Sequence, residues 1–86
     1  MPLVVEWEGY KFYFYKTEVF FEPAHIHVKG HGGNMKIWLA NLKEARPISN
    51  SIPDHKKTKI LTYVKDNLSR FQQAWQEAEQ DAGVKK

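Results

Sequence analysis

The fold is decided by residues 22–39, EPAHIHVKGHGGNMKIWL, in which two runs of alternating residues flank a glycine-rich turn. In an extended strand, successive side chains point to opposite faces, so Ile26 and Val28 share one face. The opposite face carries the polar members of the first run, which are His25, His27 and Lys29. The segment therefore predicts a strand with an apolar face turned to the core and an imidazole face open to solvent.

Further strands are expected on both sides of this one. Gly30–Asn34 contains the glycines of a tight hairpin, and Met35–Leu39 alternates again after it. Toward the N-terminus, Leu3–Trp7 alternates and Lys11–Lys16 is rich in aromatic residues, which favour strands. Residues 17–24 are expected to be a loop whose apolar stretch at 19–21 packs down. Together these segments predict a four-stranded antiparallel meander over residues 3–40.

The C-terminal half has the pattern of a helix. Residues 41–50 contain Pro47 and are interpreted as an irregular crossover. Ser51 is expected to cap a helix that extends over roughly 52–81, with Gly83 as its stop. One apolar stripe recurs at helical spacing and comprises Ile60, Leu61, Val64, Leu68, Phe71 and Trp75. This stripe is expected to cover the apolar face of the sheet, which carries Leu3, Val5, Trp7, Phe12, Phe14, Ile26, Val28, Ile37 and Leu39.

The predicted fold class is α+β, an antiparallel β-sheet of about four strands with one long C-terminal α-helix packed on one face. With 86 residues, the chain is expected to form a single domain over 1–86, because two separate cores would be too small to offset the entropy of the chain. It has no cysteine, so any metal would need His, Asp or Glu ligands. No membrane span or secretion signal is recognisable, which makes a cytoplasmic protein the default. The net charge of +3 is compatible with an anionic partner.

Several motifs together resemble one small family. They are Gly9–Tyr15, the Glu22-Pro23-x-His25-x-His27-Val28 segment, Lys36-x-Trp38-Leu39, and a helix with Val64-x-x-Asn67 and Trp75. The chain is similar over nearly its whole length to the bacterial domain of unknown function 4160. It departs from the family pattern at Ala24, where a second proline is more usual, and before the helix, where its segment is longer and more polar. The family has no firmly established activity, and the resemblance implies by analogy a regulatory or toxin–antitoxin role.

The polar face of the predicted sheet is the leading candidate for a binding site. It would collect Lys11, Tyr13, Tyr15, His25, His27, Lys29, Lys36 and Trp38. Aromatic rings interleaved with cations are what base stacking and phosphate contacts require, so nucleic acid is the first hypothesis for the partner. Alternatively, the same aromatic residues form a contact with a protein partner or a homodimer. In a further alternative, the loop at 17–24 folds over this face and makes it core.

The start of the predicted helix adds secondary candidates. Lys56 and Lys59 lie in its first two turns, where cations are unfavourable next to the positive end of the helix dipole. A bound phosphate would offset that cost. These two lysines are therefore secondary nucleic-acid-binding candidates, against the alternative of an ordinary solvated cluster.

The histidine cluster also suggests two kinds of chemistry. Two imidazoles two residues apart on a strand can chelate one divalent metal, with His31 or Glu22 as the third ligand. The metal candidates are thus His25, His27 and His31. The same pair, His25 and His27, could instead serve as general base and general acid of a nuclease, with or without a metal. Two hydrogen-bonded surface histidines without catalytic function are the alternative.

Overall fold

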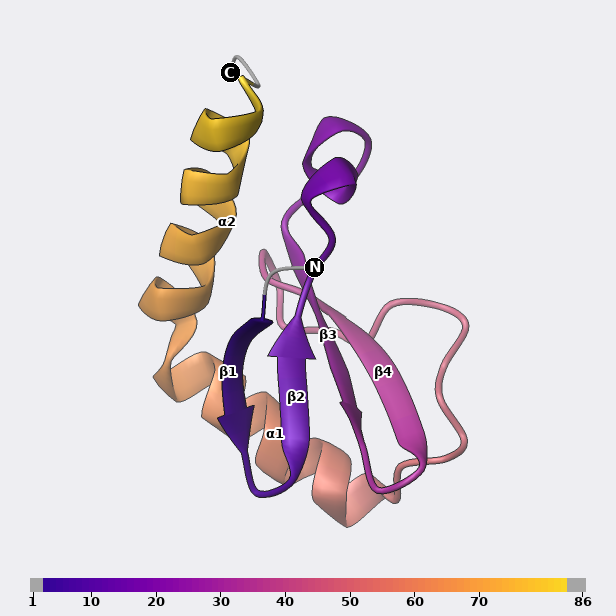
Figure 1. Cartoon of the computed structure of the whole chain (residues 1–86). Helices are drawn as coiled ribbons and strands as arrows, with labels where there is room; N and C mark the ends of the chain where they lie inside the picture. Colours follow the sequence, from indigo (N-terminus) through magenta and orange to yellow (C-terminus); the bar gives the residue numbers. More distant parts are fainter. Residues whose placement is uncertain (1–2, 84–86) are drawn as a thin grey trace.

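The computed structural model describes residues 3–83, which form one antiparallel sheet, a short 3₁₀ helix and two α-helices (Figure 1). The elements are β1 (Leu3–Trp7), β2 (Tyr10–Tyr13), η1 (Lys16–Phe20), β3 (His25–Gly30), β4 (Gly33–Trp38), α1 (Asp54–Asp66) and α2 (Leu68–Ala82). The strands lie in the order β1-β2-β3-β4, and each pairs antiparallel with its neighbour. The α+β class and the four-stranded meander are confirmed.

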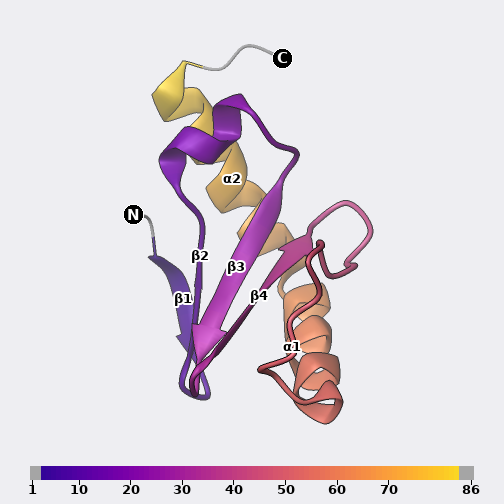
Figure 2. The same cartoon turned by 90° about the vertical axis from the view of Figure 1, so that its right-hand side faces the viewer.

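The core lies between one face of the sheet and the two helices. Figure 2 shows α1 and α2 on the same side of the twisted sheet, where α1 crosses the strands and α2 continues past their ends. Phe12 from β2 packs against Phe71 of α2, with ring centroids 5.7 Å apart. The other fully enclosed apolar side chains are Phe14, Ile26, Val28, Ile37, Ile60 and Val64. The predicted core face of the sheet is confirmed, except for Leu3, whose side chain lies outside those that the structure describes.

The single long helix predicted over 52–81 is wrong, because the chain bends at Asn67. This residue leaves helical geometry, with φ −118° and ψ 23°. Its side-chain amide donates to the carbonyl of Tyr63 at 2.9 Å, and its own carbonyl accepts the N–H of Arg70 at 3.0 Å. Asn67 thus ends α1 and begins α2, a role that suits an asparagine because its side chain competes with backbone hydrogen bonds. The apolar stripe stays in phase across the break, which is why it predicts one helix.

The helix start also differs from the prediction. Pro53 rather than Ser51 occupies the cap position, and its carbonyl accepts the N–H groups of Lys56 and Lys57, both at 2.9 Å. A residue before proline is held in extended geometry, so the helix cannot begin at residue 52. Ser51 instead lies 3.0 Å from Ser49 between their hydroxyl oxygens. The irregular crossover therefore extends to Pro53.

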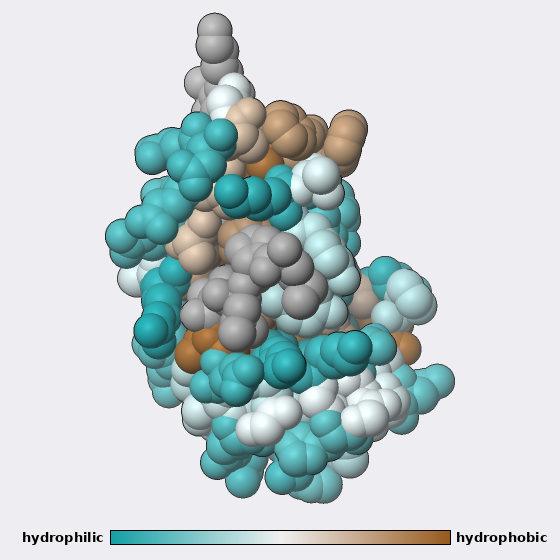
Figure 3. All heavy atoms as spheres, in the orientation of Figure 1, coloured by the Kyte–Doolittle hydropathy of each residue, from teal (hydrophilic) through white to brown (hydrophobic). Residues whose placement is uncertain are grey.

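The segment between β2 and β3 contains the 3₁₀ helix η1, which the sequence pattern did not predict. β2 ends at Tyr13, short of the strand expected over 11–16. Val19 packs into the core as expected, but the expectation is wrong for Phe20 and Phe21, which are 55% and 84% exposed. Figure 3 shows the hydrophobic side chains gathered over η1 at the upper right of the molecule. Among residues 3–83, neither α-helix is long and apolar enough to cross a membrane.

Candidate nucleic-acid interface and histidine cluster

The candidate site lies on the face of the sheet that the helices do not cover. Strand register places Tyr13 opposite His27, and His27 opposite Lys36, so these three side chains form a row across β2, β3 and β4. The ring of Tyr13 stacks on that of His27, with centroids 5.3 Å apart and planes 25° apart. Tyr15 meets the ring of Tyr13 edge-on at 5.7 Å and is 45% exposed. Alternation along the strands therefore puts these aromatic and basic groups on one face, as predicted.

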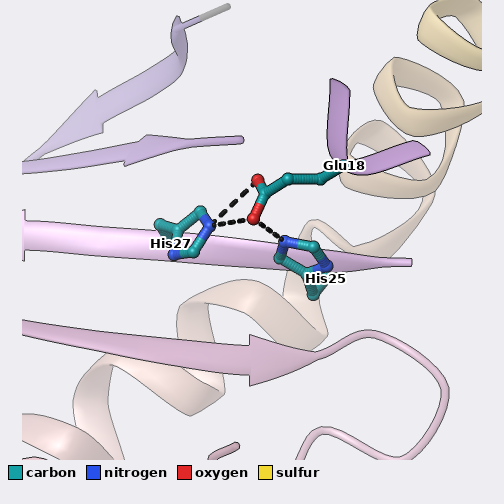
Figure 4. A group of neighbouring side chains, drawn as sticks. All are labelled: Glu18, His25 and His27. Carbon is teal, nitrogen blue, oxygen red and sulfur yellow. Dashed lines mark hydrogen bonds and ion pairs between the residues drawn. The ribbon is translucent and has the colours of Figure 1, made fainter. Parts of the chain in front are cut away.

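Glu18 of η1 reaches over the start of β3 and contacts both of its histidines (Figure 4). One carboxylate oxygen, Oε2, lies 3.0 Å from Nε2 of His25 and 2.9 Å from Nε2 of His27. The other, Oε1, accepts the backbone N–H of Tyr15 at 2.8 Å. The carboxylate is thus held in place by its own 3₁₀ helix and is turned toward both imidazoles.

His25 is completely buried, so the expectation of an open imidazole is wrong at this position. The cause is not local, because α2 extends beyond the sheet and packs with η1 around the start of β3. The ring of Trp75 in α2 lies 4.9 Å from the ring of His25, and that of Trp38 lies 5.7 Å away. The alternative in which the 17–24 segment folds over this face therefore holds at His25 only. The side chain of His27 stays 20% exposed.

The protonation of this cluster is set by hydrogen bonds as well as burial. Burial raises the pKa of Glu18, but the Tyr15 N–H, the hydrogen bond from His27 and the nearby imidazoles outweigh it and leave the pKa below its ordinary value. For Tyr13, burial raises the pKa of the phenol, and Tyr15 and Glu18 add to the increase. Glu18 is therefore a carboxylate and Tyr13 a neutral phenol near neutral pH.

Two grooves flank Tyr13 and Tyr15 on this face, each with a volume of about 570 Å³. The first lies between the tyrosines and the crossover and contains His27, Lys36 and Arg46. The second runs along the hairpin turns and contains Lys11, Lys29 and His31. Among the described residues, no carboxylate lines either groove. The face therefore carries two basic grooves with a pair of aromatic rings between them.

Lys36 and Trp38 are less available than their positions on the strand suggest. The ammonium of Lys36 pairs with Glu22 and lies 4.6 Å from the centroid of the Trp38 ring. Glu22, considered above as a metal ligand, is thus engaged in a salt bridge with β4. Lys36 retains 23% side-chain exposure and still lines the first groove.

Three of the predicted site residues lie elsewhere: one is outside the histidine cluster, and two are on the other side of the sheet. His31 occupies the turn between β3 and β4, where its Nε2 lies 3.0 Å from the carbonyl of Glu8, and it does not join His25 and His27. Lys56 and Lys59 belong to α1 on the far side of the sheet, and Lys59 borders a separate hollow with Trp7 and Tyr63. Their predicted roles in binding stay predictions.

Sequence reasoning missed two members of the site. Glu18 lies seven residues from His25 in a segment without periodicity, and only a 3₁₀ turn brings its carboxylate back over β3. The sequence offers only a weak signal, an acidic residue in a segment expected to cover this face. Arg46 lies in the crossover, and its place beside the sheet follows from the pairing of Ile37 with Glu44, which anchors that segment to β4.

A family model described as domain of unknown function (DUF4160) matches residues 9–76 of the chain. The match covers β2, β3, β4, η1, α1 and the first part of α2 but not β1, and it includes every residue of the histidine cluster. No curated protein and no solved structure gives a match.

Proposed function

We propose that this chain, which belongs to the DUF4160 family of domains of unknown function, binds single-stranded nucleic acid through the uncovered face of its sheet. The bases would stack on Tyr13 and Tyr15, and the phosphates would lie in the two flanking grooves. Such binding fits the regulatory or toxin–antitoxin role that the family resemblance implies by analogy, and the cytoplasmic location that is the default expectation for this sequence. A single strand is favoured over a duplex because its bases are free to stack.

The observation that carries this proposal is the charge of the grooves. Lys11 and Lys29 line one groove and Lys36 and Arg46 the other, without a carboxylate among the described lining residues. Lys36 is already paired with Glu22, so Arg46 supplies most of the charge of the second pair. Lys11 and Lys29 lie directly opposite each other in the β2–β3 pair and are both exposed. Adjacent like charges on neighbouring strands are destabilising, and Glu6, opposite Lys11 on the β1 side, offsets only part of that cost, so an anionic ligand between the lysines would offset more of it.

The aromatic residues supply the second requirement. Tyr15 is 45% exposed, and the neighbouring Tyr13 is held in place by its stack on His27. Stacking of a base on such a ring contributes about 1–3 kcal/mol and depends little on sequence. Binding through this face is therefore expected to be salt-dependent and only weakly sequence-selective.

The proposal is tested by fluorescence anisotropy with short labelled RNA and DNA oligonucleotides, single-stranded and duplex, over a range of salt concentrations with chelator present. Tyr15→Ala should weaken binding by about 1–3 kcal/mol through lost stacking. Lys11→Gln combined with Lys29→Gln should lower the slope of log affinity against log salt by about 1.4, because each phosphate contact on a single strand contributes about 0.7.

Lys56→Gln combined with Lys59→Gln is the matched control, because it removes the same charge from α1. This control should bind like the unmodified protein. Absence of salt-dependent binding in the unmodified protein would exclude the proposal and leave the protein-partner and homodimer alternatives. A loss confined to the α1 variant would move the site to the helix.

A nuclease is the second candidate, and the position of His27 favours it. This imidazole lines the first groove and is hydrogen-bonded to the carboxylate of Glu18, which would orient it as a general base. The buried His25 cannot touch a phosphodiester, so the acid–base pair of two histidines is not formed as expected. His27→Gln should abolish cleavage of a bound RNA while binding persists. Cleavage that survives this change would remove His27 from the reaction.

A further inference from the structure

We propose that Glu18, His25 and His27 form a binding site for one divalent transition-metal ion such as Zn²⁺ or Fe²⁺. One ring nitrogen of each histidine and a carboxylate oxygen of Glu18 all lie within 4.8 Å of one another. Two imidazoles and one carboxylate are a donor set that these ions take in proteins, with further positions open to water. This inference does not depend on nucleic-acid binding.

The strongest observation is the buried Nε2 atom of His25. His25 Nδ1 lies 2.9 Å from the carbonyl of Pro23, which can only accept, so Nδ1 carries a proton. Nε2 is fully buried and has no hydrogen-bond partner, although Oε2 of Glu18 is 3.0 Å away. A neutral His25 therefore directs a lone pair into the space beside the carboxylate. A buried polar atom without a partner is costly, and a cation placed there would satisfy it.

The distances fit ligands around a common ion better than a hydrogen bond. Two atoms that each lie about 2.1 Å from an ion are separated by about 3.0 Å at the 90° angle of octahedral coordination, and by about 3.4 Å at the tetrahedral angle. Each then points at the ion rather than at the other atom, so a proton on the nitrogen would miss the oxygen. Nε2 of His25 and Oε2 of Glu18 show both features. Nε2 of His27 lies 2.9 Å from the same oxygen in hydrogen-bond geometry, so the ion would take the place of the hydrogen on this nitrogen.

The residues around the cluster already hold the three side chains in position. The Pro23 carbonyl fixes the tautomer and ring orientation of His25, which is the usual role of a second ligand layer. The Tyr15 N–H occupies Oε1 of Glu18 and leaves Oε2 for the ion. Trp38 and Trp75 enclose the ring of His25, which excludes water from that side. His27 also lines the first groove, so an ion held here would border it.

The competing explanation is a proton in place of the ion. It requires a doubly protonated His25, which is a buried cation paired with Glu18, and the desolvation of both charges opposes that arrangement. It also leaves the N–H of Nε2 poorly aimed at its acceptor. A metal ion satisfies both histidines and the carboxylate with neutral imidazoles, which is the form that ligates.

The test is metal binding by untagged protein from which metals have been removed with a chelator. Titration with Zn²⁺, measured by calorimetry, and with Co²⁺, measured by its visible absorption, should show one ion per chain. Glu18→Gln and His27→Gln should each lower the affinity by more than about 10-fold, the smallest effect typical of losing even an outer-layer partner. His25 is left unchanged in these variants because its burial makes misfolding a risk.

The matched control replaces both remaining histidines, His31→Gln with His55→Gln, and should still bind one ion with unchanged affinity. Circular dichroism of each metal-free variant shows whether it is folded. If Glu18→Gln does not fold, the proposed site is tested by the Zn²⁺ affinity of His27→Gln and by ¹⁵N NMR of the imidazoles in the unmodified protein. The expected spectrum shows Zn²⁺ shifting Nε2 of both His25 and His27 while Nδ1 of His25 keeps its proton. No bound ion, binding lost in the His31/His55 variant, or unshifted His25 resonances would each overturn the proposal.

Discussion

At the scale of the residue, identical side chains two positions apart on one strand have different environments. His25 is fully enclosed and His27 is partly exposed, although alternation places both on the same face of β3. The face of each residue could be predicted from the sequence because it depends only on strand geometry. Its exposure could not be predicted, because it depends on α2 and η1, which are distant in the chain. For the same reason, the sequence indicates Glu22 as a metal ligand rather than Glu18, whose position beside the histidines depends on η1.

Replacement of His25 by alanine tests its structural role. The change removes a buried ring between Trp38 and Trp75 and leaves the Pro23 carbonyl without its donor. We expect the free energy of unfolding to fall by about 3 kcal/mol, in the range for large buried side chains. Urea denaturation of metal-free protein measures it. His55→Ala, at an exposed position in the first turn of α1, is the control and should cost less than about 1 kcal/mol. Equal effects of the two changes would contradict the burial of His25.

At the scale of the element, the strands follow their local patterns but the helices and η1 do not. Period-2 alternation and glycine turns are sufficient to predict β1 to β4, because both signals are local. The helix break is invisible in the stripe, since Ile60, Val64 and Phe71 remain on one side across Asn67. The bend lets α1 cross the sheet while α2 continues past it and packs with η1. That departure from a straight helix encloses the histidine cluster.

Trp75 is the side chain of α2 that connects these elements. It is buried between Phe14 and His25, with ring centroids 5.0 Å and 4.9 Å away. Trp75→Ala should lower the free energy of unfolding by about 3–5 kcal/mol. It should also speed hydrogen exchange at the Tyr15 amide, which is bonded to Glu18, because η1 loses its support. Gln76→Ala, on the exposed side of α2, should change neither. Unchanged exchange at Tyr15 would show that η1 is ordered independently of α2.

At the scale of the whole molecule, the two faces of the sheet differ in the side chains that they carry and in what covers them. One face packs on the helices and supplies the core, and the other carries the tyrosine pair and the two basic grooves. A net charge of +3 is too small to draw nucleic acid to the protein without selectivity, so the placement of the lysines matters more than their number. The histidine cluster lies at the edge of this face. The proposed metal site and the proposed nucleic-acid surface can therefore be tested separately.

The most direct test of nucleic-acid binding is a map of backbone amide NMR shifts during titration with a short single-stranded RNA. The binding proposed here predicts that the shifts concentrate at Lys11, Tyr13, Tyr15, Lys29 and Arg46, with α1 unaffected. The shifts should fade as salt is added, because phosphate contacts release counterions. Shifts confined to α1, or none at RNA concentrations well above that of the protein, would contradict the assignment of this face as the binding surface.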